Sequence, residues 1–305
     1  MGRTGRVVVI GDALIDELRD AGGVREFVGG AALNVAVGLS RLGLPTTLIA
    51  MVGDDEAGEH IRSYLDDYGV DLLATPSPLG SARAVSTRTA GEPVYEFNDA
   101  AKARSVGFGE AEQAALAAAA VVVVSSWPFD DPAQTEALAA ALADTPGLVV
   151  VDPNPRAGML RDAAAFVEGF ERVAADADLV KVGDDDAALL YREGVDAVVE
   201  RLRGLGTRAV LATSGAGGAG VSTYGIDIRR PISTAPAPIV DTMGAGDAVL
   251  ASAVASVLSR WPEDEEAWGQ LLTTAMDVAA ATCRFEGALL RLPSALSGLD
   301  ERGGS

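Results

Sequence analysis

One stretch late in the chain, residues 239–248, constrains the fold more than any other. It runs from apolar residues through a turn of small residues into a helical pattern that extends to about Arg260. Gly244, Ala245 and Gly246 have little or no side chain, so their backbone N–H groups can closely approach an anion. The dipole of the following helix adds partial positive charge there. The stretch therefore predicts a strand-to-helix anion site.

Asp247 follows this turn and falls in the first turn of the predicted helix. A carboxylate has the wrong charge for holding phosphate, but it is well placed to take a proton from a hydroxyl that attacks the phosphate. A second interpretation is structural, because an acidic residue also stabilises a helix N-terminus. The stretch taken alone does not decide between the two.

The rest of the chain alternates short apolar runs with helical patterns. The first strand is expected at 7–10, and a helix opens after Gly29 and Gly30. Further strands are expected at 46–52, 70–73, 121–124, 148–151, 179–182 and 209–212, with helices between them. This alternation predicts an α/β fold with a doubly wound, mostly parallel sheet flanked by helices.

Residues 82–97 interrupt the alternation. Two segments of alternating polarity flank Gly91-Glu92-Pro93, which is typical of a β-hairpin. We expect a single domain over residues 1–305, with a small β-strand lid formed by about 12–28 and 82–98.

Two motifs resemble the signatures of a known family, the ribokinase-like (PfkB) carbohydrate kinases. Asp-Thr-Met-Gly-Ala-Gly-Asp at 241–247 resembles the C-terminal signature, and 29–43, which begins Gly-Gly-Ala-Ala-Leu-Asn, resembles the N-terminal one. The similarity spans about residues 7–293 and is nearest to the fructokinase-like members. It implies a kinase that moves the γ-phosphoryl of ATP to a sugar hydroxyl with Mg²⁺. Asp247 would be the base, and the backbone of Gly244, Ala245 and Gly246 the oxyanion site.

The candidate sugar site begins where the first strand ends. Asp12 and Asp16 follow that strand, and ionised oxygens there can accept hydrogen bonds from several sugar hydroxyls. Asp16 is equally compatible with a solvated loop. The resemblance assigns Asp16 to the sugar, with Asp12 nearby, and adds Gly29, Gly30 and Asn34.

Two later segments supply further candidates for the sugar site. Asn98 follows the predicted hairpin and can contact the substrate or belong to a polar surface turn. Arg156 lies in the rigid Asp-Pro-Asn-Pro-Arg segment after a strand, and serves the substrate, a phosphate or a structural ion pair.

The glycine-rich segment 213–220 contains a formal Gly-x-Gly-x-x-Gly, but a hairpin pattern rather than a helix follows it. That context argues against a dinucleotide fingerprint. The resemblance instead assigns Thr213, Gly215 and Gly218 to the nucleotide, and Lys181 belongs to the same cofactor-binding group.

The metal sites are predicted from the resemblance alone. The family's Asn-x-x-Glu element near Mg²⁺ is replaced by Gly183 and Asp186, and a shorter carboxylate can hold Mg²⁺ through water. Asp241 is the expected neighbour of a K⁺ site. Met276 and Phe285 replace common residues of the adenine site, so they put the nucleotide preference in question.

The composition of the chain limits the kinds of partner that it can bind. The formal net charge is −20, which argues against nucleic acid or an anionic membrane. One cysteine excludes an intramolecular disulfide, and the apolar run at 7–10 is too short for a signal peptide, so a cytoplasmic protein is expected. The expected partners are a sugar and ATP, with a homodimer through the lid.

Several alternatives stay open at the level of the sequence. Fructose leads among acceptors, followed by 2-keto-3-deoxygluconate, ribose and nucleosides, because specificity depends on a few hydrogen bonds. Outside the kinases, the fold also suits a non-catalytic sugar or nucleotide sensor, or an oxidoreductase.

Overall fold

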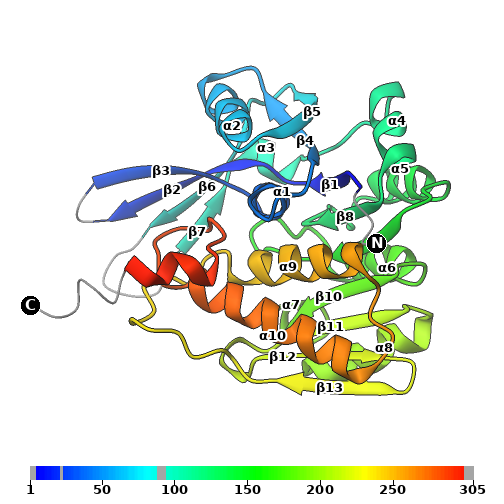
Figure 1. The fold of residues 1–305 in the computed structure, drawn as a ribbon. Coiled ribbons are helices and arrows are strands. Elements are labelled where there is room, and N and C mark those ends of the chain that lie inside the picture. Colours follow the sequence, from blue (N-terminus) through cyan, green and yellow to red (C-terminus); the bar gives the residue numbers. More distant parts are fainter. Residues whose placement is uncertain (1–4, 21–22, 88–93, 299–305) are drawn as a thin grey trace, which may run out of the picture.

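The structure of the chain, a computed structural model, describes residues 5–20, 23–87 and 94–298. Its helices and strands build two sheets (Figure 1). The expected α/β class with a large, mostly parallel sheet is confirmed. The turn predicted at Gly91-Glu92-Pro93 lies outside the described residues.

Nine strands form the larger sheet. They are β1 (Val7–Gly11), β4 (Thr46–Gly53), β5 (Val70–Ser77), β8 (Val121–Ser125), β9 (Leu148–Asp152), β10 (Leu179–Gly183), β11 (Ala209–Thr213), β12 (Ala219–Thr223) and β13 (Ile226–Arg230). Their order is β13-β12-β11-β10-β9-β8-β1-β4-β5, parallel from β11 to β5, with β12 and β13 antiparallel. Strand β5 therefore extends past the predicted end at residue 73.

Strand β1 has β4 on one side and β8 on the other. The chain thus moves outward from β1 in both directions, which opens a crevice at the carboxyl ends of β1 and β8. The residues that directly follow β1 and β8 are therefore placed at the usual ligand position of such sheets.

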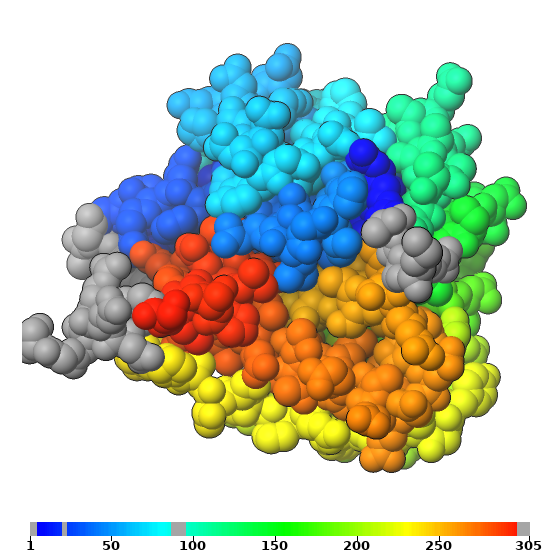
Figure 2. Space-filling model, viewed as in Figure 1, coloured from blue at the N-terminus to red at the C-terminus, as the bar shows by residue number. Residues whose placement is uncertain are grey.

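Helices cover both faces of this sheet. One face carries α1 (Ala31–Arg41), α2 (Glu56–Asp67), α9 (Ala245–Ser259) and α10 (Glu265–Thr282); the other carries α4 (Glu110–Ala118), α5 (Pro132–Leu142), α6 (Ala163–Ala174), α7 (Asp184–Leu190) and α8 (Val195–Leu205). Alternation along β1 explains the two cores, because Val7 and Val9 join one and Val8 and Ile10 the other. Figure 2 shows α9 packed beside α1, with α10 on the other side of α9.

The smaller sheet consists of β2 (Leu14–Asp20), β3 (Gly23–Gly29), β6 (Ala82–Thr87) and β7 (Val94–Phe97), in the order β3-β2-β6-β7. These strands come from the two segments from which the lid is expected. Leu14, Ala82 and Met159 share an apolar cluster that fixes the base of this sheet to the main body. Within the described ranges, no helix is long and apolar enough to cross a membrane.

Two helical glycines test the packing between α6 and the loop before α5. A Cβ on buried Gly169 would lie 2.3 Å from the backbone oxygen of Phe129, whereas a Cβ on exposed Gly204 in α8 would meet nothing within 4 Å. We expect Gly169→Ala to lower the free energy of unfolding by about 1–3 kcal/mol through overpacking. Gly204→Ala should raise it by about 0.5–1 kcal/mol. Urea unfolding of both variants checks the signs, and a stabilised Gly169→Ala would contradict this packing.

Candidate active site

The predicted anion turn is present at the start of α9. Gly244 caps this helix with a φ of 74°, a conformation that favours glycine. A Cβ at this position would also lie 2.5 Å from the carbonyl oxygen of Ala288. The turn therefore needs glycine at Gly244 for both conformation and space, and Ala245 and Gly246 then begin the helix.

Asp247 is buried in the first turn of α9 and is held by a residue of α1. Asn34 Nδ2 donates a hydrogen bond to Asp247 Oδ2 at 2.8 Å. Burial raises the pKa of Asp247, while this hydrogen bond and the positive charges of Arg156 and Lys181 lower it. The result is a carboxylate of increased basicity with a fixed orientation. The Asn34–Asp247 contact was not predicted, because their pairing depends on how α1 packs on α9.

Asp12 and Asp16 lie where the sugar site was predicted. Asp12 Oδ1 accepts from the backbone N–H of Ala32 at 3.0 Å, so Asp12 also caps the start of α1. Gly30 before this helix has a φ of 105°. A Cβ on Gly29 would lie 2.2 Å from Asp16 Oδ2, so the absence of a side chain at Gly29 makes room for the Asp16 carboxylate.

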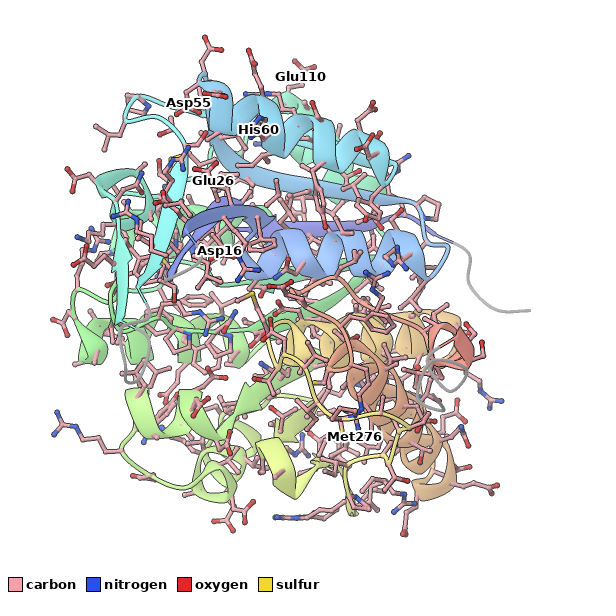
Figure 3. All side chains as sticks on the ribbon, turned by 90° about the vertical axis from the view of Figure 1, so that its left-hand side faces the viewer. Asp16, Glu26, Asp55, His60, Glu110 and Met276 are labelled. Carbon is pink, nitrogen blue, oxygen red and sulfur yellow. The ribbon has the colours of Figure 1, made fainter. Side chains whose placement is uncertain are left out.

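Three carboxylates and one guanidinium form a coupled group here. Burial is the main cause that raises the pKa of Asp16 to about 7. The charges of Asp12 and Asp247 contribute to this rise, and the charge of Arg156 opposes it. The side chain of Arg156 is exposed and makes no hydrogen bond or ion pair with another described residue. Figure 3 shows Asp16 on the small sheet near α1, far from Met276 on α10. The charges of Asp12, Asp247 and Arg156 thus all act on the Asp16 carboxylate.

Asn98 has a structural role that differs from the predicted one. Its side chain caps α3 (Asp99–Lys102) by accepting from Ala101 N at 3.0 Å. The same oxygen accepts from Arg83 N, and its nitrogen donates to Ser81 O at 2.9 Å. These bonds tie β6 to the chain after β7, so we remove Asn98 from the candidate sugar ligands.

Lys181 is buried beside the anion turn. Its Nζ lies 3.2 Å from both carboxylate oxygens of Asp152 and 4.0 Å from Asp186. A Cβ on Gly246 would lie 3.4 Å from this Nζ, so the ammonium faces the start of α9. Burial lowers the pKa of Lys181, but the charges of Asp152, Asp186 and Asp247 outweigh it and raise the pKa. Lys181 therefore carries a positive charge next to the predicted phosphate position.

Asp186 lies in the first turn of α7, and its carboxylate is 4.0 Å from the Lys181 ammonium that faces the start of α9. Its Oδ2 accepts from the backbone N–H of Gly183 at 2.7 Å. Among the described residues, no group of three or more His, Cys, Asp or Glu side chains is arranged to hold a metal ion. The donor set therefore fits a metal bound mainly by phosphate oxygens and water, as Mg²⁺ commonly is, rather than by a protein cage.

Thr213, Gly215 and Gly218 surround the end of β11, next to the end of β10. Gly215 and Gly218 have φ values of 43° and 90°, and a Cβ on Gly218 would lie 2.1 Å from Arg230 O. A 3₁₀ turn and the β12–β13 hairpin follow, with no helix. The prediction that this segment is not a dinucleotide fingerprint is therefore confirmed by its context.

A pocket of about 400 Å³ lies at the expected adenine site. Its lining comprises Ser233, Thr234, Ala235, Pro236, Asp277, Ala280, Pro293, Leu296 and Ser297. Met276, the residue that the sequence singled out, is buried in the core instead. Asp277 and Ala280 occupy the pocket face of α10, because successive helical positions point about 100° apart. Met276 therefore does not line this pocket, whereas its neighbour Asp277 does.

Asp241 connects two loops. Its Oδ1 accepts from Met243 N at 3.0 Å and its Oδ2 from Gly287 N at 3.1 Å. The carboxylate thus joins the segment before α9 to the segment before Gly287, which are the two loops of the predicted K⁺ site.

Known proteins share this architecture over nearly the whole chain. The profile of the pfkB family of carbohydrate kinases matches residues 5–295. This chain belongs to the pfkB carbohydrate kinase family. A fructokinase of Klebsiella pneumoniae is 30% identical over 300 residues, covering 95% of this chain and 96% of that protein. The predicted family and kinase class are therefore confirmed.

Solved structures of similar fold agree. Aminoimidazole riboside kinase from Salmonella enterica, complexed with aminoimidazole riboside and an ATP analog, has a TM-score of 0.78 and 26% identity, covering 96% of this chain and 99% of that one. A fructokinase double mutant from Vibrio cholerae O395, with fructose, ADP and potassium ion bound, has a TM-score of 0.81 and 21% identity, covering 98% and 99%. At 21% identity, the similarity to the second structure shows only that the two proteins share a fold.

The raised pKa of Asp16 makes a testable prediction about stability. A folded-state pKa of about 7, above its ordinary value of 3.8, means that the folded state binds the proton more tightly. Stability is therefore lost as pH rises from about 4 to about 7. We expect Asp16→Asn to abolish this loss and to be on the order of 2 kcal/mol more stable than wild type at pH 8, half of the full linkage value because Asp16 is only partly buried.

Thermal unfolding of Asp16→Asn across pH 4 to 8 measures this effect. Asp66→Asn, which changes an exposed carboxylate of α2, is the matched control. A gap between Asp16→Asn and wild type that does not widen with pH would contradict the predicted titration.

Proposed function

We propose that this carbohydrate kinase transfers the γ-phosphoryl of ATP to a hydroxyl of a sugar, with fructose as the first candidate acceptor. The observation that carries the proposal is the juxtaposition at the start of α9. A buried carboxylate, Asp247, lies beside the glycine turn and the Lys181 ammonium, and its titration is coupled to Asp12 and Asp16. The fructokinase relatives support fructose as the acceptor.

The proposed chemistry has one proton transfer and one phosphoryl transfer. Asp247 accepts the proton of the attacking hydroxyl, the sugar oxygen bonds to the γ-phosphorus, and the bond to the β-phosphate oxygen breaks to release ADP. The hydrogen bond from Asn34 holds the Asp247 carboxylate in place. Asp12, Asp16, Asn34 and Arg156 orient the sugar, and Gly29 and Gly30 leave space for it.

Positive charge for the phosphoryl group comes from two sources. The N-terminus of α9 supplies the positive end of the helix dipole at Gly244 and Gly246, and Lys181 supplies a full charge. The backbone N–H of Ala245 already donates to Thr242 O at 3.2 Å, so it would have to leave that bond to bind the phosphoryl group. Both are fixed before substrate binds, because Lys181 is buried and paired with Asp152. Thr213, Gly215 and Gly218 contact the ribose and phosphates of the nucleotide, and the 400 Å³ pocket takes the base.

The ions and the lid complete the proposal. Mg²⁺, when bound, offsets phosphate charge, and Asp186 would hold it through water with the oxygen that does not bind Gly183. K⁺ would be held mainly by carbonyl groups near Asp241. The β3-β2-β6-β7 sheet is the proposed lid over the sugar, and its exposed side is the proposed homodimer contact.

Asp247→Asn tests the proposed base. We expect kcat to fall by about 10²–10⁴-fold, because the amide cannot accept the proton, while sugar binding is largely retained. A coupled ADP-release assay with ATP, Mg²⁺ and K⁺ measures turnover. Asp264→Asn, which changes the N-cap of α10 away from the site, is the matched control. Wild-type turnover by Asp247→Asn would refute the assignment.

Lys181 needs a double variant, because removing it alone leaves Asp152 as an unpaired buried charge. We expect Lys181→Met with Asp152→Asn to fold, with kcat lowered by about 10²–10³-fold through loss of phosphate stabilisation. Turnover and the melting temperature are measured together. A folded double variant with unchanged kcat would mean that the ion pair is structural only.

A panel of hexoses, pentoses, sugar acids and nucleosides in the same assay tests the function as a whole. Phosphorylation of a sugar by wild type, absent in Asp247→Asn, is the expected result. If no acceptor is phosphorylated while sugars or ATP still raise the melting temperature, the non-catalytic sensor becomes the better account.

A further inference from the structure

A small cavity lies at the end of the candidate sugar site, beside Asp12. Its volume is about 20 Å³, and it is enclosed by the ends of β1 and β8, the base of the small sheet and the segment after α3. The lining includes Asp12, Leu14, Arg104, Ser126, Trp127 and Met159. Most of the wall is apolar, so the few polar groups in it decide what it can bind.

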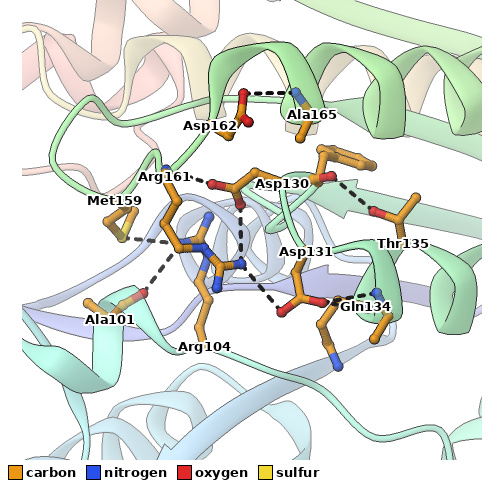
Figure 4. Close-up of polar contacts among 12 residues, drawn as sticks. Ala101, Arg104, Asp130, Asp131, Gln134, Thr135, Met159, Arg161, Asp162 and Ala165 are labelled. Atoms are coloured by element: carbon orange, nitrogen blue, oxygen red, sulfur yellow. Dashed lines mark hydrogen bonds and ion pairs between the residues drawn. The ribbon is translucent and has the colours of Figure 1, made fainter.

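Arg104 is the cation of this cavity, and its contacts are weak. Its Nε donates to Ser126 O at 3.3 Å. Its Nη1 donates to Ala101 O at 3.3 Å and to Met159 Sδ at 3.5 Å (Figure 4). These distances exceed the usual 2.9–3.0 Å for N–H···O bonds. Within residues 5–20, 23–87 and 94–298, Arg104 forms no ion pair within 4.0 Å.

The acidic residues near Arg104 are already paired with another arginine. Arg161 Nη2 lies 3.3 Å from Asp131 Oδ2 and 3.6 Å from Asp130 Oδ1. The other oxygen of Asp130 accepts from the backbone N–H of Arg161 at 2.7 Å. Asp12 and Asp130 act on Arg104 only through longer-range charge. Burying part of a guanidinium without an anionic partner costs free energy, unless a ligand supplies the negative charge.

Two more polar groups of this wall are buried. The indole N–H of Trp127 makes no hydrogen bond with the described residues. The hydroxyl of Ser126 lies near the Asp12 carboxylate and lowers its pKa. Ser126 also has a φ of 55°, a strained conformation for a residue other than glycine. The carboxylate of Asp12 already accepts the N–H of Ala32. The cavity therefore has more free donors than free acceptors.

We propose that the acceptor sugar carries a carboxylate, and that Arg104 binds this group in the cavity beside Asp12. The inference rests on the proposed kinase function and narrows its substrate to a sugar acid. A planar carboxylate matches the fork of the guanidinium and offers only acceptors to the surrounding donors. The cavity is small, at about 20 Å³, and a planar carboxylate needs less room in it than a phosphate with three terminal oxygens.

The negative charge of Asp12 repels an anion that enters the cavity, but the two neighbouring arginines offset part of this repulsion. Burial raises the pKa of Asp12. Arg104 and Arg156 both lower that pKa, so two guanidinium groups act on the same carboxylate. An incoming carboxylate would thus meet both positive groups as well as Asp12.

Matched acceptors separate this inference from the kinase proposal. 2-Keto-D-gluconate and D-fructuronate are fructose with a carboxylate at C1 or C6, and fructose 1-phosphate carries a phosphate at C1. We expect wild type to use one of the two acids with a kcat/KM at least about 10-fold above that for fructose. In Arg104→Leu, the acid-to-fructose ratio should fall by about 10–100-fold, and Arg104→Lys should retain part of it.

Arg161→Leu is the matched control, because it removes the neighbouring arginine that is already paired. It should leave the acid-to-fructose ratio unchanged, and melting temperatures confirm that each variant is folded. A preference for fructose or fructose 1-phosphate over both acids would overturn the inference. So would an Arg104→Leu variant that loses acid and fructose turnover equally. If wild type phosphorylates fructose but neither acid, only the carboxylate fails; if it phosphorylates no sugar, the kinase proposal fails with it.

Discussion

The hydrogen bond from Asn34 to Asp247 joins two helices that are far apart in the chain and ties the acceptor side of the site to the phosphate side. Helix α1 begins beside Asp12 and Asp16, and α9 begins at the glycine turn. The two helices pack together in one core, so their N-termini open at the same edge of the sheet. In the proposed reaction, that packing lets one carboxylate, Asp247, face both the sugar hydroxyl and the phosphoryl group.

The second constraint is charge. A chain with a formal net charge of −20 repels a nucleotide at long range, so binding must depend on charges that act at short distance. Lys181 is buried against the glycine turn, and Arg156 and Arg104 act on Asp12. Solvent therefore screens the buried Lys181 least, and the exposed Arg156 most.

The sequence predicted what local patterns determine. The strands β1, β8 and β10 follow from short β-branched runs, and the start of α9 follows from its glycines and Asp247. The partner of Asn34 and the approach of Lys181 to Gly246 depend on packing between distant elements, which periodicity does not encode. Asn98 shows that residue type alone does not assign a role. An asparagine suits both a ligand and a helix cap, and here its side chain caps α3.

The glycines of the two motifs show why motif and packing are hard to separate. Gly29 makes room for the Asp16 carboxylate, and Gly244 makes room for Ala288, so each is required before any ligand binds. Neither glycine, however, can tell one sugar from another, because neither carries a polar side chain. Discrimination must come from polar side chains, such as Asn34 within the first motif and Arg104 outside both motifs, whose hydrogen bonds are long and whose charge has no anionic partner within 4.0 Å among the described residues. The motifs therefore identify the family, whereas the choice of acceptor sugar depends on the polar side chains that contact the sugar.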